Sequence, residues 1–279
     1  MTGAPFQEID GIRCYAPALA RDFADYPSGG FDVTAEVEAR SFWCRTRNRV
    51  LTDVVGRFAG RERPLDMLEI GCGIGGVIGA LRQLPNLRLT GSEIYIQGLQ
   101  YARAKMPDVE FIQLDATDIP FNAAFDVVGA FDVLEHIDQD ELVMTEVRET
   151  LRPGGLFIIT VPQYQWMWGT LDELVHHKRR YSRRQLVERL DRAGFEVVYV
   201  TSFVTLLFPF MLASRLFDRG RGAPAESTAD FATRVDLPRP LNAAFDRIMK
   251  LDEALLHRGW SLPFGGSLLA VARRRSAIK

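Results

Sequence analysis

The chain contains 279 residues, of which 47% are hydrophobic and 25% are charged, and its formal net charge is -2. These values are ordinary for a folded globular protein, and the near balance of charge argues against nucleic acid as a partner. The three cysteines form no C-x-x-C pair, which argues against a disulfide framework or a structural zinc site and favours the cytoplasm. The N-terminus lacks the basic segment followed by an apolar core that is typical of a signal peptide, so none is expected.

Residues 1 to 44 contain several prolines and glycines, so we expect an irregular segment there. A helical pattern follows, from Thr34 through Val50 to Phe58, with Asp32 or Thr34 as its N-terminal cap. Residues 1–60 are thus predicted to form an irregular segment and one helix that precede the main domain, residues 61–279.

From Leu65 onward the pattern alternates between strand and helix, which is typical of a doubly wound, parallel α/β sheet. We predict strands at 65–70, 87–92, 109–113, 125–131, 155–161, 195–202 and 267–273. Helices are predicted between them at about 76–84, 96–105, 139–150 and 182–193. Ser182 is a suitable cap for the last of these helices, and Gly194 is a suitable end.

Two insertions, at about 162–181 and 203–260, interrupt this alternation. In the second, the apolar run 203–213 contains Pro209 and is shorter than the roughly 20 residues of a membrane span. We interpret it as a buried helix or a pocket wall, and contact with a membrane or a lipid-linked substrate is the minority alternative. Residues 218–240 are predicted to form a mobile loop, and a helix is predicted from Leu241 to Arg258.

A glycine-rich loop, Glu69-Ile70-Gly71-Cys72-Gly73-Ile74-Gly75-Gly76, joins the first of these strands to a helix. Glycines at such a junction let the bare backbone approach a nucleoside-containing ligand. The spacing of Gly71, Gly73 and Gly76 also fits the dinucleotide fingerprint, which is weak evidence on its own. Glu69 decides between the two ligands, because a carboxylate there would repel a pyrophosphate and attract an ammonium or sulfonium cation. The loop therefore favours S-adenosylmethionine over NAD.

Acidic residues follow the next strands, at the edge where open parallel sheets bind their ligands. Glu93 lies about 20 residues beyond the loop, where its carboxylate can accept both hydroxyls of a ribose. Asp115 and the amide of Ala116 can recognise an adenine, although a capping role is nearly as good an interpretation of Asp115. Asp132 ends the fourth strand, and this end should face the reactive methyl group.

Taken together, these motifs resemble those of the class I S-adenosylmethionine-dependent methyltransferases, in the broad group related to ubiquinone-biosynthesis methyltransferases. The matching motifs are the glycine loop, Glu93, Asp115-Ala116, Phe125-Asp126-Val127-Val128, Leu134-Glu135-His136 and Leu151-Arg152-Pro153-Gly154-Gly155. A narrower resemblance, to bacterial members, rests on the segments 42–49, 177–181 and 262–269.

The resemblance implies a Rossmann-like sheet of seven strands in the order 3-2-1-4-5-7-6, with the last strand antiparallel. It also implies an N-terminal lid and a helical insertion before the last strand. The cofactor would be held by Gly71 and Gly73 under the methionine and ribose, Glu69 at the amino group, Glu93 at the ribose, Asp115 and Ala116 at the adenine, and Phe131 and Asp132 at the reaction mouth. Trp43 and one of Arg45 or Arg49 would close over the cofactor.

Methyl transfer does not require a dedicated base, but a hydroxyl acceptor would benefit from a histidine. His177 is the leading candidate to touch the acceptor, followed by His136, for which a packing role is equally reasonable; His176 ranks lower, and His257 is expected to be structural. The acceptor pocket would be completed by Tyr164, Trp166, Trp168, Asp172 and Tyr181. A small satellite core is an equally good interpretation of these aromatic side chains.

The sequence therefore predicts methyl transfer from S-adenosylmethionine to a small acceptor, by O- or N-methylation, with S-adenosylhomocysteine as the product. The acceptor could be linked to a lipid or a glycan. The alternatives are an NAD(P)-dependent oxidoreductase, a protein methyltransferase and a non-catalytic module. The nucleic-acid amino-methylases carry an Asn/Asp-Pro-Pro-aromatic motif, which Asp132-Val133-Leu134-Glu135 does not match. We expect no metal, no nucleic acid, and a monomer or homodimer.

Overall fold

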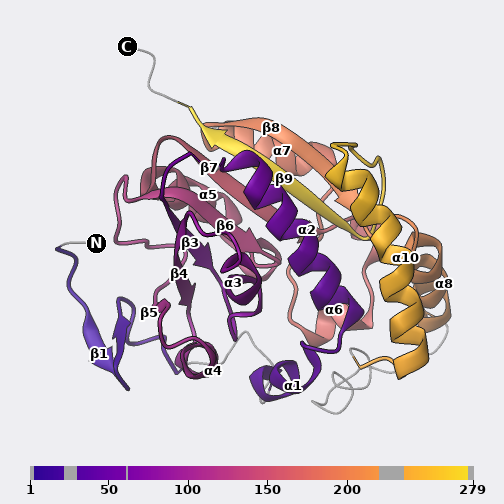
Figure 1. The fold of residues 1–279 in the computed structure, drawn as a ribbon, viewed down its shortest axis with the longest axis horizontal. Coiled ribbons are helices and arrows are strands. Elements are labelled where there is room, and N and C mark those ends of the chain that lie inside the picture. The colour runs from indigo at the N-terminus through magenta and orange to yellow at the C-terminus, as the bar shows by residue number, and fades with distance from the viewer. Residues whose placement is uncertain (1–2, 22–29, 61, 220–235, 276–279) are drawn as a thin grey trace.

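A single sheet runs through the molecule in the strand order β1-β2-β5-β4-β3-β6-β7-β9-β8 (Figure 1). The computed structural model describes residues 3–21, 30–60, 62–219 and 236–275. The strands are β1 (Gln7–Ile9), β2 (Ile12–Cys14), β3 (Leu65–Ile70), β4 (Leu87–Glu93), β5 (Glu110–Gln113), β6 (Phe125–Phe131), β7 (Leu151–Pro162), β8 (Phe195–Phe203) and β9 (Ser267–Arg274).

The centre of the sheet is parallel, as the alternation of strands and helices predicted. β3 pairs in parallel with β4 and β6, and these strands pair in parallel with β5 and β7. The final strand β9 lies between β7 and β8 and runs antiparallel to both, which confirms the expected orientation of the last strand. All seven residues of β6 are buried, as is usual for a strand covered on both faces.

The predicted number of seven strands was wrong, because the sheet has nine strands among the described residues, and the order differs accordingly at one edge. The hairpin β1-β2 extends the sheet beyond β5, to which β2 is paired in parallel. Asp10 and Gly11 join the two strands, with φ of 52° and 73°. Positive φ at both residues is the requirement of a tight hairpin turn, and the Asp-Gly dipeptide is its usual sequence signal. The signal was present in a segment predicted to be irregular.

The helices are α1 (Gly30–Val37), α2 (Phe42–Phe58), α3 (Gly76–Leu81), α4 (Ile96–Lys105), α5 (Asp140–Thr150), α6 (Thr170–Leu174), α7 (Arg183–Arg192), α8 (Phe208–Arg219) and α10 (Arg239–His257), with 3₁₀ turns η1 (Leu134–His136) and η2 (Gln165–Met167). The single helix expected from Thr34 to Phe58 is in fact two, α1 and α2. Ser41 separates them, since its extended backbone and its hydroxyl cap α2 by accepting a hydrogen bond from the Cys44 amide.

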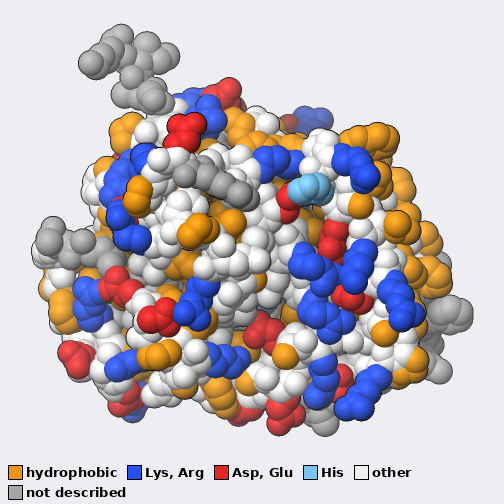
Figure 2. Space-filling view, in the orientation of Figure 1, with side chains coloured by type: hydrophobic (Ala, Val, Ile, Leu, Met, Phe, Trp, Pro, Cys, Tyr) orange, Lys and Arg blue, Asp and Glu red, His pale blue; other side chains and the backbone are white. Residues whose placement is uncertain are grey.

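Two buried clusters cover the two faces of the sheet, and α2 and α10 contact each other on one of them (Figure 1). Figure 2 shows Lys and Arg side chains gathered over these two helices. Two arginines of α2 form ion pairs with acids of α10: Arg49 with Glu253 and Asp246, and Arg45 with Asp246. The insertion before β9 is therefore attached to the helix that precedes β3.

The apolar run from Phe203 becomes the end of β8, a short turn and the start of α8, with Pro209 in the first turn of that helix. Phe203 and Leu207 are buried, whereas Phe210 is 59% exposed, so only part of the run packs into the core. Most of the loop predicted at 218–240 lies outside the described residues. Within the described part of the chain, no helix combines the length and hydropathy needed to cross a membrane.

Asp252 of α10 provides a test of how the second insertion is attached. Its buried carboxylate accepts hydrogen bonds from the amides of Thr205 (2.5 Å) and Leu206 (3.2 Å), just before α8. Asp252→Ala leaves these amides without their acceptor, so we expect a loss of about 1–3 kcal/mol in the free energy of unfolding. Urea denaturation measures it. Asp252→Asn keeps one acceptor oxygen and should lose less; an unchanged midpoint in Asp252→Ala would contradict this attachment.

Candidate functional site

A cavity of about 600 Å³ lies at the carboxyl ends of β3, β4, β5 and β6. The glycine loop after β3 forms its floor, and residues of α1, α2 and the first insertion complete its wall. In parallel sheets this edge is where loops diverge and leave a crevice for a ligand. The cavity therefore lies where the sequence placed the ligand site.

The glycine loop follows a backbone path that requires glycine. Gly71 and Gly73 have φ of +66° and +53°, and both line the cavity. A Cβ at Gly71 would lie 2.5 Å from Cγ2 of Val133, so a side chain there would collide with the segment after β6. Bare backbone is thus exposed to the cavity on the side of α3, as predicted.

Glu69, on β3, is 2% exposed and lines the cavity, and its Oε2 has no hydrogen-bond partner among the described residues. Burial raises the pKa of this carboxyl to about 8, against the attraction of the Arg47 guanidinium. An acid with these properties is close to its titration point at neutral pH. A cation placed beside it would supply the missing interaction.

Glu93 ends β4 and is also buried at the cavity. One carboxylate oxygen accepts from the amide of Gly73 (3.0 Å) and the other from the amide of Ile94 (2.8 Å). Burial raises the pKa of Glu93, and the hydrogen bonds from backbone amides oppose that rise. The predicted ribose acid is therefore anchored directly to the glycine loop.

The remaining predicted cofactor residues after β5 and β6 also line the cavity. Asp115 accepts from the amide of Thr117 at 2.8 Å, so the capping interpretation describes one of its contacts. Ala116 and Phe131 are buried beside it in the lining. Asp132 has a φ of +59°, which is uncommon without glycine, and accepts from the Thr160 hydroxyl at 3.1 Å.

The cation that faces the cavity is Arg47, which lies between the two arginines that were predicted. Its guanidinium is 3.1 Å from Oδ2 of Asp132. Arg45 and Arg49 instead pair with α10, and Trp43 stacks on Phe203 at 5.5 Å outside the cavity lining. Helical periodicity could have revealed this difference, because positions four apart share a helix face and the position between them does not.

The charge of the cavity is acidic. Arg47 is the sole Lys or Arg among the described lining residues, whereas six carboxylates are present, those of Glu38, Glu69, Glu93, Asp115, Asp132 and Asp138. In their ionised forms these groups would attract a cationic ligand and repel a pyrophosphate. The excess of acidic over basic lining residues therefore disfavours the dinucleotide alternative, for the same electrostatic reason that Glu69 gave in the sequence.

His177 is brought to the cavity by the first insertion and held there by Asp172. Its Nδ1 is 2.8 Å from Oδ1 of Asp172, which is completely buried and also 2.7 Å from Nε of Arg180. Burial favours the neutral acid, but the hydrogen bonds from His177 and Arg180 outweigh it and hold the pKa of Asp172 below its usual value. Because an ionised carboxylate only accepts, Nδ1 of His177 donates to Asp172, and Nε2 is the ring nitrogen that this hydrogen bond leaves unused.

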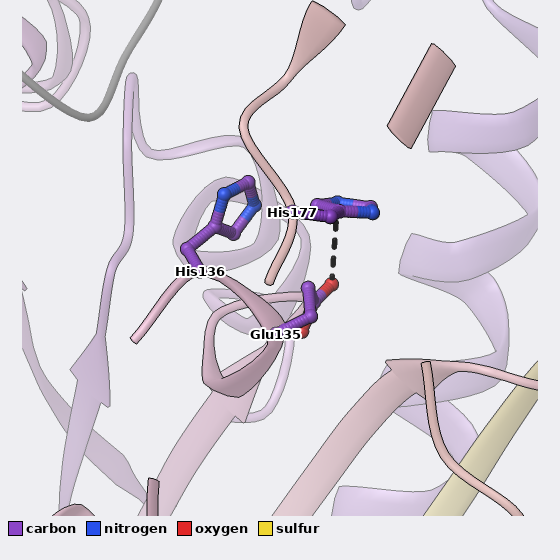
Figure 3. A group of neighbouring side chains, drawn as sticks. All are labelled: Glu135, His136 and His177. Carbon is purple, nitrogen blue, oxygen red and sulfur yellow. Dashed lines mark ion pairs between the residues drawn. The ribbon is translucent and has the colours of Figure 1, made fainter. Parts of the chain in front are cut away.

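His136 and Glu135 lie next to His177, on the turn η1 after β6 (Figure 3). The rings of His136 and His177 are 4.6 Å apart, and both residues line the cavity. Burial, followed by the neighbouring His177, lowers the pKa of His136 to about 3. Glu135 belongs to the motif Leu134-Glu135-His136, but the sequence predicted no role for it. His176 is exposed, and His257 lies on α10 beside Asp53.

The residues predicted to wall the acceptor pocket do not line the cavity. Tyr181 is 1% exposed and donates its hydroxyl hydrogen to Asp140, so it belongs to the core. Tyr164 and Trp166 stack on each other at 5.1 Å and contact Phe208, and Trp168 is half-buried nearby. Asp172 acts on the cavity only through His177. Tyr164 and Trp166 therefore contact other aromatic side chains outside the cavity lining, and Trp166 is 51% exposed.

Comparison with known proteins is consistent with this geometry. Residues 42–200 match the family model described as a methyltransferase domain. A relative from Mycolicibacterium smegmatis, named a probable S-adenosylmethionine-dependent methyltransferase, is 30% identical over 160 residues, which cover 56% of this chain and 60% of that protein. The match thus spans less than two thirds of the relative's length.

Solved structures share the fold at low sequence identity. The crystal structure of the [4+2]-cyclase SpnF has a TM-score of 0.54 and 22% identity, covering 82% of both chains. Phosphoethanolamine N-methyltransferase 2 of Haemonchus contortus, in complex with S-adenosyl-L-methionine, has a TM-score of 0.55 and 16% identity, covering 82% of this chain and 53% of that one. At these identities the likeness concerns the fold alone.

The family match covers more than half of the chain, and the glycine loop and the buried acids Glu69 and Glu93 line one cavity. The chain belongs to the class I S-adenosylmethionine-dependent methyltransferases, with S-adenosylmethionine as its cofactor.

Proposed function

We propose that the protein transfers the methyl group of S-adenosylmethionine to a hydroxyl group of a small-molecule acceptor. The observation that carries the proposal is one cavity lined both by the buried acids Glu69 and Glu93 and by a histidine oriented by a buried aspartate. The acids suit the cofactor and the histidine suits the acceptor. The fold alone would not suffice, since a similar fold occurs in a cyclase.

The cofactor is held through charge and through the glycine loop. Its amino group is assigned to Glu69, whose Oε2 lacks a partner, and its ribose hydroxyls to the carboxylate of Glu93. Asp115 and Ala116 flank the adenine, and Phe131 and Asp132 lie at the methyl end. Arg47 replaces Arg45 and Arg49 as the arginine for the carboxylate of the cofactor, because it faces the cavity.

The acceptor hydroxyl is placed against Nε2 of His177. In an in-line displacement the hydroxyl oxygen forms the new bond to the methyl carbon while the bond from carbon to sulfur breaks, and the hydroxyl proton must leave. Nε2 of His177 can take this proton, because Asp172 holds the other nitrogen protonated and stabilises the imidazolium that results. An amine that is already neutral would need no such base, which is why we favour O-methylation.

The cavity that His177 lines also has apolar residues that suit an acceptor with an apolar body. They include Val133, Ile137, Val175 and Phe131. A few oriented polar groups in an apolar wall are typical of sites for small organic molecules. A free small molecule and the small end of a lipid-linked or glycan-linked compound share this chemistry.

The pKa of Glu69 predicts that cofactor binding depends on pH. With a pKa of about 8, the carboxyl is mainly protonated between pH 6 and 7, whereas the bound ammonium group favours the carboxylate. Binding of S-adenosylhomocysteine should therefore release a proton, and its affinity should rise with pH by up to about tenfold per unit. Calorimetry in buffers of different ionisation enthalpy measures the release. Glu69→Gln should reduce it; equal release in both proteins would contradict the assignment of Glu69.

Two substitutions should separate cofactor binding from acceptor activation. Glu93→Ala removes charged hydrogen bonds to the ribose and should weaken S-adenosylhomocysteine binding about ten- to a hundredfold. His177→Ala should leave that affinity within twofold and lower turnover by about a hundredfold or more. Turnover is measured by transfer of labelled methyl from the cofactor to acceptors in a cell extract. His176→Ala, exposed and adjacent, is the matched control; normal turnover in His177→Ala would remove His177 from the mechanism.

A further inference from the structure

Glu135 is a buried carboxylate that the proposed methyl transfer does not use. It is 0% exposed, and neither of its carboxylate oxygens has a hydrogen-bond partner among the described residues. Buried polar groups are nearly always hydrogen-bonded, and an exception calls for a specific explanation such as an ion. Its backbone carbonyl oxygen accepts a hydrogen bond from the Lys178 amide at 2.7 Å. The backbone of Glu135 is therefore hydrogen-bonded, and its carboxylate is the part without a hydrogen bond.

Two histidines complete a cluster with this carboxylate (Figure 3). One ligand atom each of Glu135, His136 and His177 lie within 4.8 Å of one another. Oε1 of Glu135 and Nε2 of His177 are 3.9 Å apart. Two ligands of one zinc ion lie about 3.4 Å apart, given bonds of about 2.0–2.2 Å in a tetrahedron. Metal binding would therefore draw these ligand atoms closer together than they lie in this structure.

The surroundings of the histidines are those of metal ligands. A histidine that binds a metal through one ring nitrogen usually donates its other N–H to a carboxylate or a backbone carbonyl. Nδ1 of His177 does so to Asp172, at 2.8 Å. One nitrogen of His177 is thus occupied by a protein partner, and the other lies on the side of Glu135.

We propose that Glu135, His136 and His177 form a binding site for one divalent transition-metal ion, with Zn²⁺ the best match. Two imidazoles and one carboxylate are a usual ligand set for zinc in sites that keep a further position open. His136 and His177 line the cavity, so the open position faces the acceptor. The sequence led us to expect no metal, because it contains no local spacing of ligands typical of zinc; His177 is 41 residues away from His136 along the chain.

The ion has a direct consequence for the acceptor, which rests on the proposed methyl transfer. An acceptor hydroxyl in the open position would be bound as its oxygen anion near neutral pH, because the ion lowers the pKa of a bound hydroxyl. Nε2 of His177 cannot be a ligand and a base at the same time. The metal-loaded protein therefore activates the hydroxyl through the ion, and the metal-free protein through His177.

Zinc binding without cofactor or acceptor tests the site independently of methyl transfer. The full chain is treated with a chelator and dialysed, and Zn²⁺ is then titrated against a chromophoric competitor. We expect one Zn²⁺ per chain. Glu135→Gln, which preserves side-chain shape, should weaken binding at least tenfold, and Asp172→Asn should do so by about ten- to a hundredfold. His176→Gln is the matched control and should bind as the unmodified chain does. Retained S-adenosylhomocysteine binding verifies that each variant is folded.

Cobalt provides a second measurement that needs no variant. Co²⁺ added to the metal-free chain should give visible absorption typical of a low-coordinate nitrogen and oxygen site, and Zn²⁺ should abolish it. Absence of stoichiometric Zn²⁺ binding overturns the proposal, as does binding that Glu135→Gln leaves unchanged. If zinc binds as expected but methyl transfer is never detected, the site stands and the proposed function fails. If methyl transfer occurs without zinc binding, the opposite holds.

Discussion

Buried carboxylates without enough partners are the constraint on which the account of this protein depends. Removing a carboxylate from water costs several kcal/mol unless a cation or hydrogen bonds compensate it. Glu69 and Glu135 both have an oxygen without a hydrogen-bond partner among the described residues. Glu69 lies near the end of β3, and Glu135 lies on η1, just after the adjacent strand β6. Such groups either remain protonated or receive positive charge from a ligand. We have proposed the amino group of the cofactor as the partner of the first, and a metal ion as the partner of the second.

The parallel sheet explains why these acids converge. Residues that follow β3, β4, β5 and β6 are separated by tens of positions along the chain, yet they meet at one edge because the strands run in the same direction. The sequence therefore predicted this part of the site: Glu69, Glu93, Asp115 and Asp132 all line the cavity. The alternation of strands and helices and the spacing of the acids were sufficient to predict these positions, because the geometry of a parallel sheet is regular.

Residues outside the repeating unit were predicted less well, for physical reasons. The side chains of Tyr164, Trp166 and Tyr181 follow a strand end in sequence, but their packing is decided by contacts with α8 and the core, which composition does not encode. The prediction chose Arg45 and Arg49 rather than Arg47 because it considered the presence of arginines on the helix and not which face of the helix each one occupies. The cluster of Glu135, His136 and His177 depends on how the first insertion folds back on η1, and no local pattern predicts that contact.

A crystal structure of the chain with S-adenosylhomocysteine tests the central claim most directly. The account predicts that the amino group of the ligand lies within hydrogen-bonding distance of the Glu69 carboxylate. Both ribose hydroxyls should donate to Glu93, with its bond to the Gly73 amide retained or replaced by the ribose. A ligand bound elsewhere, or bound in this cavity with Glu69 still lacking a partner, would contradict the role assigned to the buried acids.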